Sequence, residues 1–122
     1  MFAFAVPPGR WRVTGIIGPT ELNFCLGSPS FEIAAGEVVY AGSFDQNAAD
    51  ISPNLDLAPA KAWLGSEPQA QLVRPAAYVN GSQGLCGGGG IYALEFKGAP
   101  FEPGYVWGSV AAMPATTAAK TP

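Results

Sequence analysis

Apolar and polar residues alternate along much of the chain, and this alternation has the period of a β-strand. It predicts a first strand over residues 2–6 and a second over residues 10–14, separated by a Pro-Pro-Gly turn. In the second strand Trp11 and Val13 share one face, and two arginines lie on the other. A half-buried antiparallel strand has this pattern.

Further strands are predicted wherever the alternation returns between turn residues. The ranges are 22–26, 31–33, 37–44, 51–57, 78–82, 92–97 and 105–107. Gly36 separates two of these ranges and supplies the positive φ that a tight hairpin needs. The pattern therefore predicts a mainly β fold, an antiparallel β-sandwich of roughly seven to eight strands.

A helical insertion interrupts the strands at about residues 58–74. Pro59 suits a first helical turn, and Gly65 suits the C-terminal end of the same helix. Ser66 and Gln69 have the spacing of a capping box, which would open a second short helix. The insertion is thus predicted to be one broken helix or two short ones.

The composition is poor in charge. Of the 122 residues, 12% are charged, against about 25% in typical soluble domains, and 48% are hydrophobic. The mean hydropathy is +0.19. We expect a single domain over residues 1–110, with part of its surface covered by a protein partner or by a second copy. Residues 111–122 have the composition of a flexible tail or linker.

Charge and hydropathy also exclude some partners. The net charge is −3, and lysines and arginines are not concentrated in any stretch, so we expect no nucleic-acid partner. The chain has no apolar run near the roughly 20 residues of a transmembrane helix. Any lipid anchor would lie outside this sequence.

The two cysteines, Cys25 and Cys86, lie far apart, and neither belongs to a Cys-x-x-Cys pair of the kind found in zinc and redox sites. We expect a disulfide between them, which would stabilise the fold by about 4 kcal/mol. Such a bond persists in oxidising compartments, so it predicts an exported protein. The alternative is two separate buried thiols.

The chain contains no histidine. This removes the usual general base, the Ser-His and Cys-His dyads and the commonest metal ligand. The nine acidic residues are scattered and define no carboxylate pair of the glycosidase kind. We therefore expect a protein that is not an enzyme and uses no cofactor, and the alternative is an unrecognised carboxylate-dependent enzyme.

Two groups of polar residues are candidate ligand sites. One is a group of oxygen-bearing side chains in a single loop region: Asp45, Asn47, Asp50, Asn54 and Asp56. Calcium takes such ligands, but the spacing is not that of an EF-hand, and the alternative is a solvated loop with Asx turns and a helix cap at Asp56. The other group is Arg10 and Arg12, which could receive a carboxylate or a sugar phosphate, or form a solvated strand face.

Three smaller features have competing interpretations. The Gly-rich run 87–90 lacks the Lys-Ser/Thr of a phosphate-binding loop, which favours a flexible connection. Asn80, followed by Gly and Ser, fits the N-glycosylation acceptor pattern. Trp63, Tyr105 and Trp107 could stack on carbohydrate, form a protein contact, or belong to the core.

Two segments, residues 6–13 (VPPGRWRV) and 31–40 (FEIAAGEVVY), resemble small bacterial envelope β-sandwiches of the transthyretin-like or carboxypeptidase-regulatory-like kind. The resemblance covers about the first third of the chain and carries no active-site residue. It implies an exported module, periplasmic, outer-membrane-associated or extracellular, some of these being lipoproteins. The function it implies is non-enzymatic binding or structural support in the cell envelope. A carbohydrate- or calcium-binding β-sandwich module is the alternative.

Overall fold

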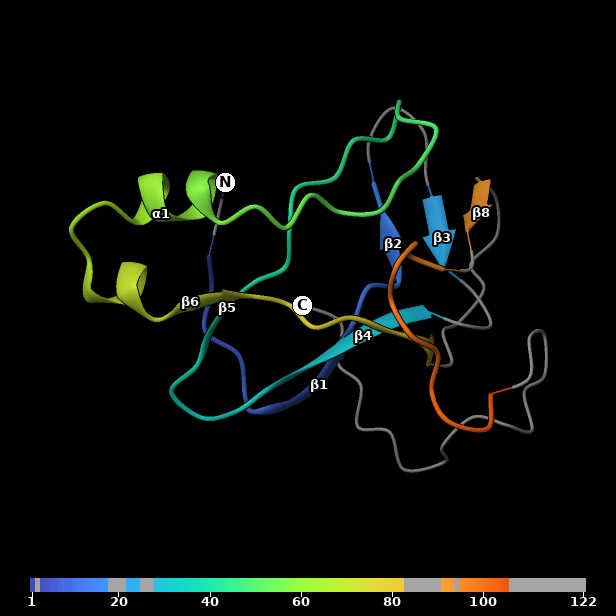
Figure 1. Cartoon of the computed structure of the whole chain (residues 1–122), viewed down its shortest axis with the longest axis horizontal. Coiled ribbons are helices and arrows are strands. Elements are labelled where there is room, and N and C mark those ends of the chain that lie inside the picture. Colours follow the sequence, from blue (N-terminus) through green and yellow to red (C-terminus); the bar gives the residue numbers. More distant parts are fainter. Residues whose placement is uncertain (2, 18–21, 25–27, 83–90, 94, 106–122) are drawn as a thin grey trace.

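The computed structural model of the chain consists of short strands and two short helical segments (Figure 1). It describes residues 1, 3–17, 22–24, 28–82, 91–93 and 95–105, and of residues 91–93 the backbone alone. The strands are β1 (Gly9–Arg12), β2 (Gly15–Ile16), β3 (Leu22–Phe24), β4 (Ser28–Ile33), β5 (Val38–Tyr40), β6 (Val73–Pro75), β7 (Val79–Ser82) and β8 (Ile91–Ala93). The helix α1 (Ala58–Leu64) and the 3-10 helix η1 (Pro68–Gln71) lie between β5 and β6. The expected mainly β fold with a short helical insertion is confirmed.

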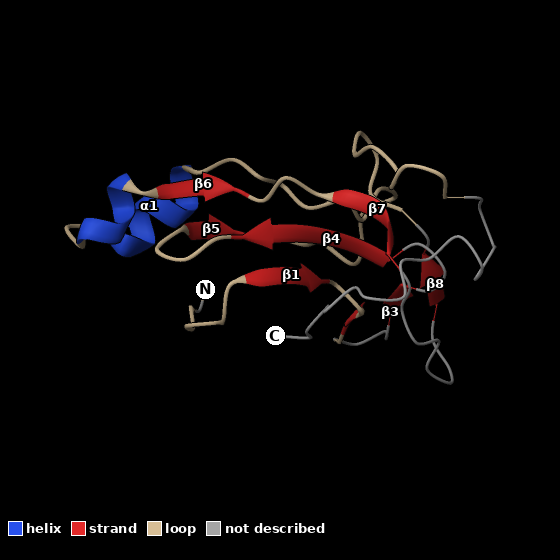
Figure 2. Ribbon diagram, turned by 90° about the horizontal axis from the view of Figure 1, so that it is seen from below, coloured by secondary structure: helices blue, strands red, loops and turns tan. Residues whose placement is uncertain are grey.

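The strands form three small sheets, with the orders β1-β4-β7, β2-β3-β8 and β5-β6. The pairings β1 with β4, β2 with β3 and β4 with β7 are antiparallel, as expected, whereas β3 with β8 and β5 with β6 are parallel. Parallel neighbours need a crossover connection, and α1 and η1 belong to the one that joins β5 to β6. In Figure 2 the strands β1, β4 and β7 lie side by side, and the helical segment lies at one end of the molecule.

The pairing of β1 with β4 explains the alternation seen along β1. Residues opposite one another in an antiparallel pair share a face of the sheet. The pairs are Arg10 with Glu32, Trp11 with Phe31, and Arg12 with Ser30. Trp11 is therefore on the apolar face, where it is buried, and its Nε1 donates a hydrogen bond to the Pro7 carbonyl at 3.0 Å. The arginines lie on the opposite face, as the sequence predicted.

Aromatic side chains from distant parts of the chain form the core. The buried Phe96 ring packs edge-on against Phe24 of β3, with a centroid distance of 5.2 Å, and against Tyr78, at 4.9 Å. Edge-to-face packing is a favourable arrangement of aromatic rings. The Tyr78 hydroxyl donates to the Ala41 carbonyl at 2.7 Å, and burial raises the pKa of Tyr78 above its ordinary value. The core therefore links β3, the segment before β7 and the segment after β8.

Several strand predictions were wrong because alternation does not specify a pairing partner. Residues 51–57 form one isolated bridge, between Asn54 and Ser43, and no strand. Residues 3–7 form no strand, and Phe4 is 51% exposed. Gly36 does adopt a positive φ of 80°, but it does not close a hairpin, because β5 pairs with β6 and β4 pairs with β1 and β7. Extended segments form strands only where another strand completes their hydrogen bonds.

The ends of other elements also differ from expectation. The capping box is absent, since η1 begins at Pro68 after Glu67, and the side chain of this N-cap residue makes no capping hydrogen bond. Glu95 and Phe96 lie beyond β8, where Phe96 turns into the core. Tyr105 is not in a strand. The rest of that expected strand, the glycine run and the expected tail over residues 111–122 lie outside the described residues.

Candidate functional site

One face of the sheet β1-β4-β7 collects charged and hydroxyl side chains. Arg10 and Arg12 project from β1 on this face, opposite Glu32 and Ser30 of β4. Ser82 of β7 joins them, because its hydroxyl donates to the Ser30 Oγ at 2.8 Å. We call this set the polar face, and its members are Arg10, Arg12, Ser30, Glu32, Ser82 and Glu102.

Arg10 is neutralised within the polar face by two carboxylates. Its Nε donates to Glu32 Oε1 at 3.1 Å, and its Nη1 lies 2.6 Å from Glu102 Oε1. The second contact is an ion pair that lacks hydrogen-bond geometry, since Glu102 Oε1 is buried and accepts no hydrogen bond. Because both carboxylates contact the same guanidinium, they offset its positive charge and weaken its attraction for an external anion.

Arg12 has a different environment from Arg10. Its side chain is half-buried, and its Nε is shielded from solvent and donates to no acceptor. None of the ion pairs among the described residues includes Arg12. Burial lowers the pKa of Arg12 from its ordinary value, but a guanidinium still remains protonated in a protein. Of the two arginines expected to contact an anion, the structure leaves Arg12 without an internal counter-ion in the described part of the chain.

Asn80 has a structural role that excludes the glycosylation interpretation. It is 1% exposed, its Nδ2 donates to the carbonyls of Phe96 at 2.9 Å and Ala99 at 3.2 Å, and its Oδ1 accepts from the Phe96 N–H at 2.9 Å. A glycan on this nitrogen would have to break both donated bonds and enter the core. The acceptor pattern is therefore inaccessible in the folded chain.

The five oxygen-bearing side chains of residues 45–56 lie along a loop, and most of them bond to the loop's own backbone. Four Oδ1 atoms accept a hydrogen bond at 2.9 to 3.1 Å from the N–H two residues further along: those of Asp45, Asp50, Asn54 and Asp56. These bonds are the expected Asx turns. Asp56 accepts a hydrogen bond from the N–H of Ala58, the first residue of α1. The N-cap residue of the helix is nevertheless Leu57, not Asp56. Within the described residues, no three Asp, Glu, Cys or His side chains are grouped to hold a metal ion.

A third ion pair joins β6 to the turn between β4 and β5. Arg74 donates to Glu37 through Nε at 2.7 Å and through Nη2 at 2.8 Å, and the same Nη2 donates to the Glu32 carbonyl at 3.1 Å. Glu37 also accepts from the Ala34 N–H at 2.7 Å. The hydrogen bonds from Arg74, followed by the one from Ala34, lower the pKa of Glu37 to about 2. This Arg74–Glu37 pair fixes the turn against β6.

Acid should remove the contribution of the Arg74–Glu37 pair to stability. The folded-state pKa of Glu37 is about 2 and its ordinary value is 4.5, so the unfolded chain binds a proton first as the pH falls. The free energy of unfolding should then fall from about pH 5 down to about pH 2. Glu37→Gln should flatten this slope in urea unfolding measured across that range. Glu67→Gln, an exposed control, should keep the wild-type slope, and an unchanged slope in E37Q would contradict the role of the pair.

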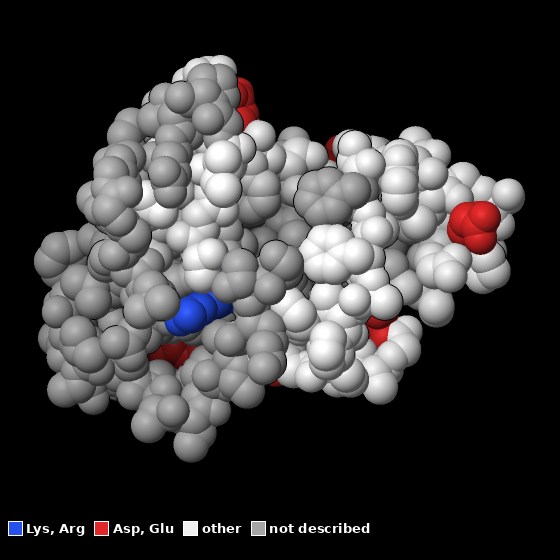
Figure 3. Space-filling view, turned by 180° about the vertical axis from the view of Figure 1, so that it is seen from behind, with Lys and Arg blue, Asp and Glu red and all other residues white. Residues whose placement is uncertain are grey.

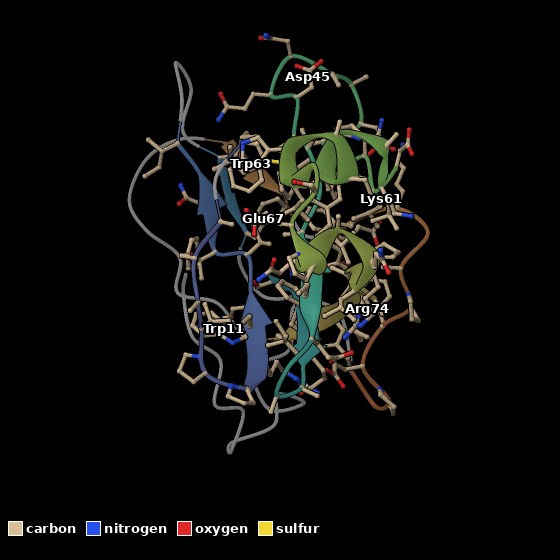
Figure 4. The ribbon with its side chains drawn as sticks, turned by 90° about the vertical axis from the view of Figure 1, so that its left-hand side faces the viewer. Trp11, Asp45, Lys61, Trp63, Glu67 and Arg74 are labelled. Carbon is tan, nitrogen blue, oxygen red and sulfur yellow. The ribbon has the colours of Figure 1, made fainter. Side chains whose placement is uncertain are left out.

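The end of the molecule formed by α1 and η1 exposes apolar side chains. Of the α1 residues Ala60 is buried, whereas Trp63 is 50% exposed and Leu72, just after η1, is 60% exposed. Trp63 and Lys61 project from opposite sides of α1 (Figure 4). The N-terminal residue Met1, 57% exposed, lies at the same end (Figures 1 and 2). We call Met1, Trp63 and Leu72 the apolar end.

The aromatic residues considered for ligand stacking do not form one group. Trp63 belongs to the apolar end, whereas Tyr105 stacks on Phe101 with a centroid distance of 5.6 Å. Trp107 lies outside the described residues. Figure 3 shows one face of the molecule, on which the described surface is mostly uncharged.

The alternation in residues 10–14 indicated the two arginines of the polar face but not the residues around them. Glu102 is distant in sequence, and Ser30 and Ser82 are single hydroxyls in turn-rich segments. The one available signal was the alternation in residues 31–33, which places Glu32 on the face opposite to Phe31 and Ile33. The alternation does not predict that β4 pairs with β1, and this pairing is what places Glu32 next to Arg10.

The expected disulfide falls on Cys25 and Cys86, which lie outside the described residues. Among the helices of the described part, α1 has seven residues, and no helix there is long and apolar enough to span a bilayer. A scan of protein-family models, a search of curated proteins and a search of solved structures each gave no match.

Proposed function

We propose that the protein is a non-enzymatic module of a bacterial cell envelope that binds or braces another protein. The observation that carries the proposal is the apolar end, where Trp63 and Leu72 are half or more exposed. An isolated helix shorter than about 12 residues is marginal in water, and α1 buries little more than Ala60. A partner that covers Trp63 and Leu72 would stabilise this segment and remove its apolar surface from water.

The use of the charged side chains supports a binding role in preference to catalysis. Arg10, Arg74, Glu32, Glu37 and Glu102 are engaged in ion pairs that join neighbouring segments. Charges held in this way fix neighbouring segments to one another. The low overall charge, 12% of residues, agrees with a surface that is partly covered.

The envelope location rests on the sequence. It combines the resemblance of residues 6–13 and 31–40 to envelope β-sandwiches with the expected Cys25–Cys86 disulfide, which requires an oxidising compartment. The β-sandwich is part of the same proposal, with β1-β4-β7 in one layer and β2-β3-β8 in the other. The aromatic core supports this arrangement, because Phe24 belongs to β3 and Tyr78 immediately precedes β7. Intact mass before and after reduction tests the disulfide.

The binding role is tested with the double variant Trp63→Ser/Leu72→Ser. Sedimentation velocity on the purified chain and a pull-down from bacterial envelope extract should show self-association or a retained protein partner for the wild type. The double variant should lose at least about 90% of that association, because both side chains supply apolar area to the contact.

Ile17→Ser is the matched control, since Ile17 is 89% exposed but follows β2, away from the apolar end. This variant should bind as the wild type does, and circular dichroism should show that all variants are folded. A wild-type chain that is a monomer and retains no partner would contradict the proposal. So would equal retention by the wild type and the folded double variant. The alternative, a carbohydrate- or calcium-binding module, is tested by thermal unfolding with calcium or with each member of a glycan panel. It requires a ligand that raises the midpoint of unfolding.

A further inference from the structure

Asn80 is the one asparagine in the sequence that precedes a glycine. Asparagine is a thermolabile residue, because the peptide nitrogen of the next residue can attack its side-chain amide carbon. Glycine favours this attack, since it has no Cβ beside the nitrogen and restricts the backbone least. The pair Asn80–Gly81 is therefore the position at which an unfolded form of this chain is most open to deamidation.

The fold holds Asn80 in an arrangement that opposes this reaction. The side chain is 1% exposed, and its Nδ2, the leaving group, donates to the Phe96 carbonyl at 2.9 Å and to the Ala99 carbonyl at 3.2 Å. The backbone of Asn80 is also held, since its N–H donates to the Pro100 carbonyl at 2.8 Å and its carbonyl accepts from the Glu102 N–H at 2.7 Å. Ring closure turns the side chain back onto the next peptide nitrogen, so it requires these contacts to open.

The glycine of the pair is enclosed by the same segment. Gly81 is buried and adopts a positive φ of 112°. A Cβ atom at this position would lie 3.2 Å from Glu102 Cβ and 3.2 Å from Tyr105 Cγ, closer than ordinary van der Waals contact. Both members of the pair are thus required by the fold, the asparagine for its hydrogen bonds and the glycine for its conformation.

From these observations we propose that Asn80–Gly81 is a deamidation site that the folded chain suppresses and that the opening of residues 96–102 activates. In the opened chain the Gly81 nitrogen loses its proton to hydroxide and forms a bond to Asn80 Cγ. The bond from Cγ to Nδ2 breaks, and Nδ2 takes up a proton from water and leaves as ammonia. Water then opens the resulting ring at either carbonyl, which gives aspartate or isoaspartate. The reaction consumes water, releases ammonia and involves no change of oxidation state.

Neither product fits the native structure. Aspartate at position 80 replaces the Nδ2 donor with an oxygen, which would face the Phe96 and Ala99 carbonyl oxygens at hydrogen-bond distance. Burying acceptors against one another without a donor is unfavourable. Isoaspartate adds a carbon to the main chain of β7, between the residues Val79 and Ser82 that pair with β4. An opening that lasts long enough for the reaction therefore removes the chain from the folded population.

The first test compares the reaction in the folded and the unfolded chain. The protein is kept in mildly alkaline buffer without urea and with urea above the unfolding midpoint, and peptide mapping by mass spectrometry follows Asn80 and Asn47. Asn47 is an exposed internal control that precedes alanine. In urea Asn80 should react at least about tenfold faster than Asn47, because its neighbour has no Cβ. Without urea the Asn80 rate should fall at least about a hundredfold, because the bonded segment must first open.

Phe96→Ala tests the link to opening while leaving Asn80 and Gly81 in place. The variant loses the ring that holds residue 96 in the core, so Asn80 should react at least about tenfold faster than in the wild type without urea. The rate in urea should be unchanged, since the reacting groups are the same. Ile17→Ser, at a side chain that is 89% exposed, is the control and should keep both wild-type rates.

The loss of the folded state is measured on chains aged in urea, diluted into buffer and separated by size-exclusion chromatography, with briefly treated chains as the control. The folded fraction should contain chains that are unmodified at Asn80, and Asn80→Asp should unfold at a much lower urea concentration than the wild type. Three results would overturn the inference: equal Asn80 rates with and without urea, a rate in urea no faster than that of Asn47, and an N80D chain as stable as the wild type. None of these measurements involves the apolar end or a partner, so they are independent of the proposed function.

Discussion

Asn80→Ala should lower the free energy of unfolding by about 3 to 5 kcal/mol, the largest loss that we expect from a single polar substitution. The Asn80 side chain satisfies the Phe96 N–H, the Phe96 carbonyl and the Ala99 carbonyl from a position that is 1% exposed. Alanine would leave the Phe96 N–H and the Ala99 carbonyl without this partner, and the Phe96 carbonyl would keep only the long bond from the Ala99 N–H at 3.4 Å. Each group that loses its partner inside the fold costs about 1 to 3 kcal/mol. Equilibrium urea unfolding monitored by tryptophan fluorescence measures the loss.

Asn54→Ala is the control for this experiment. Asn54 also accepts a backbone hydrogen bond, from the Asp56 N–H at 2.9 Å, but it is exposed. Water can replace that bond, so the loss should be below about 1 kcal/mol. Equal losses in N80A and N54A would mean that Asn80 does not organise residues 96–99.

Phe96→Ala should cost about 3 to 5 kcal/mol and should reduce the cooperativity of unfolding. Phe96 is 2% exposed, and its ring contacts rings from three separate segments: Phe24 at 5.2 Å, Tyr78 at 4.9 Å and Phe44 at 5.8 Å. Removing the ring leaves a cavity where these segments meet, and they are not joined there by strand pairing. Differential scanning calorimetry measures both the midpoint and the width of the transition.

Phe101→Ala makes the same chemical change at a side chain that is 40% exposed and stacked on Tyr105. We expect a loss well below that of F96A, because less apolar area leaves the interior. If both variants unfold at the same midpoint, the aromatic core described for Phe96 is not the main source of stability.

The sequence predicted those elements whose signals are local. Alternation identified the extended segments that became β1, β3 and β5, and Pro59 with Gly65 marked α1 correctly, since Gly65 follows its last residue. The Asx turns of the loop were also predictable, because each joins a side chain to a backbone group two residues away. Interactions of this kind need no knowledge of the rest of the fold.

Pairing and the polar face were not predictable, because they depend on residues far apart in the chain. The alternation in residues 2–6 indicated a strand as strongly as that in residues 10–14, yet the described residues 3–6 form no strand, whereas the second segment pairs with β4. The separate roles of Arg10 and Arg12 have the same origin. Both arginines occupy equivalent positions in the pattern, and the difference is made by Glu32 and Glu102, which reach one of them and not the other.

The sequence of the crossover from β5 to β6 can change faster in evolution than the sequence of the strands that it joins. The two strands are paired with each other, and the Arg74–Glu37 pair fastens β6 to the turn before β5, so both ends of the crossover are anchored. Between these anchors α1 buries Ala60 and little else. Substitutions, and even changes of length, in residues 61–72 should therefore be tolerated by the rest of the fold. Related chains can keep one scaffold while the surface at this end varies between lineages.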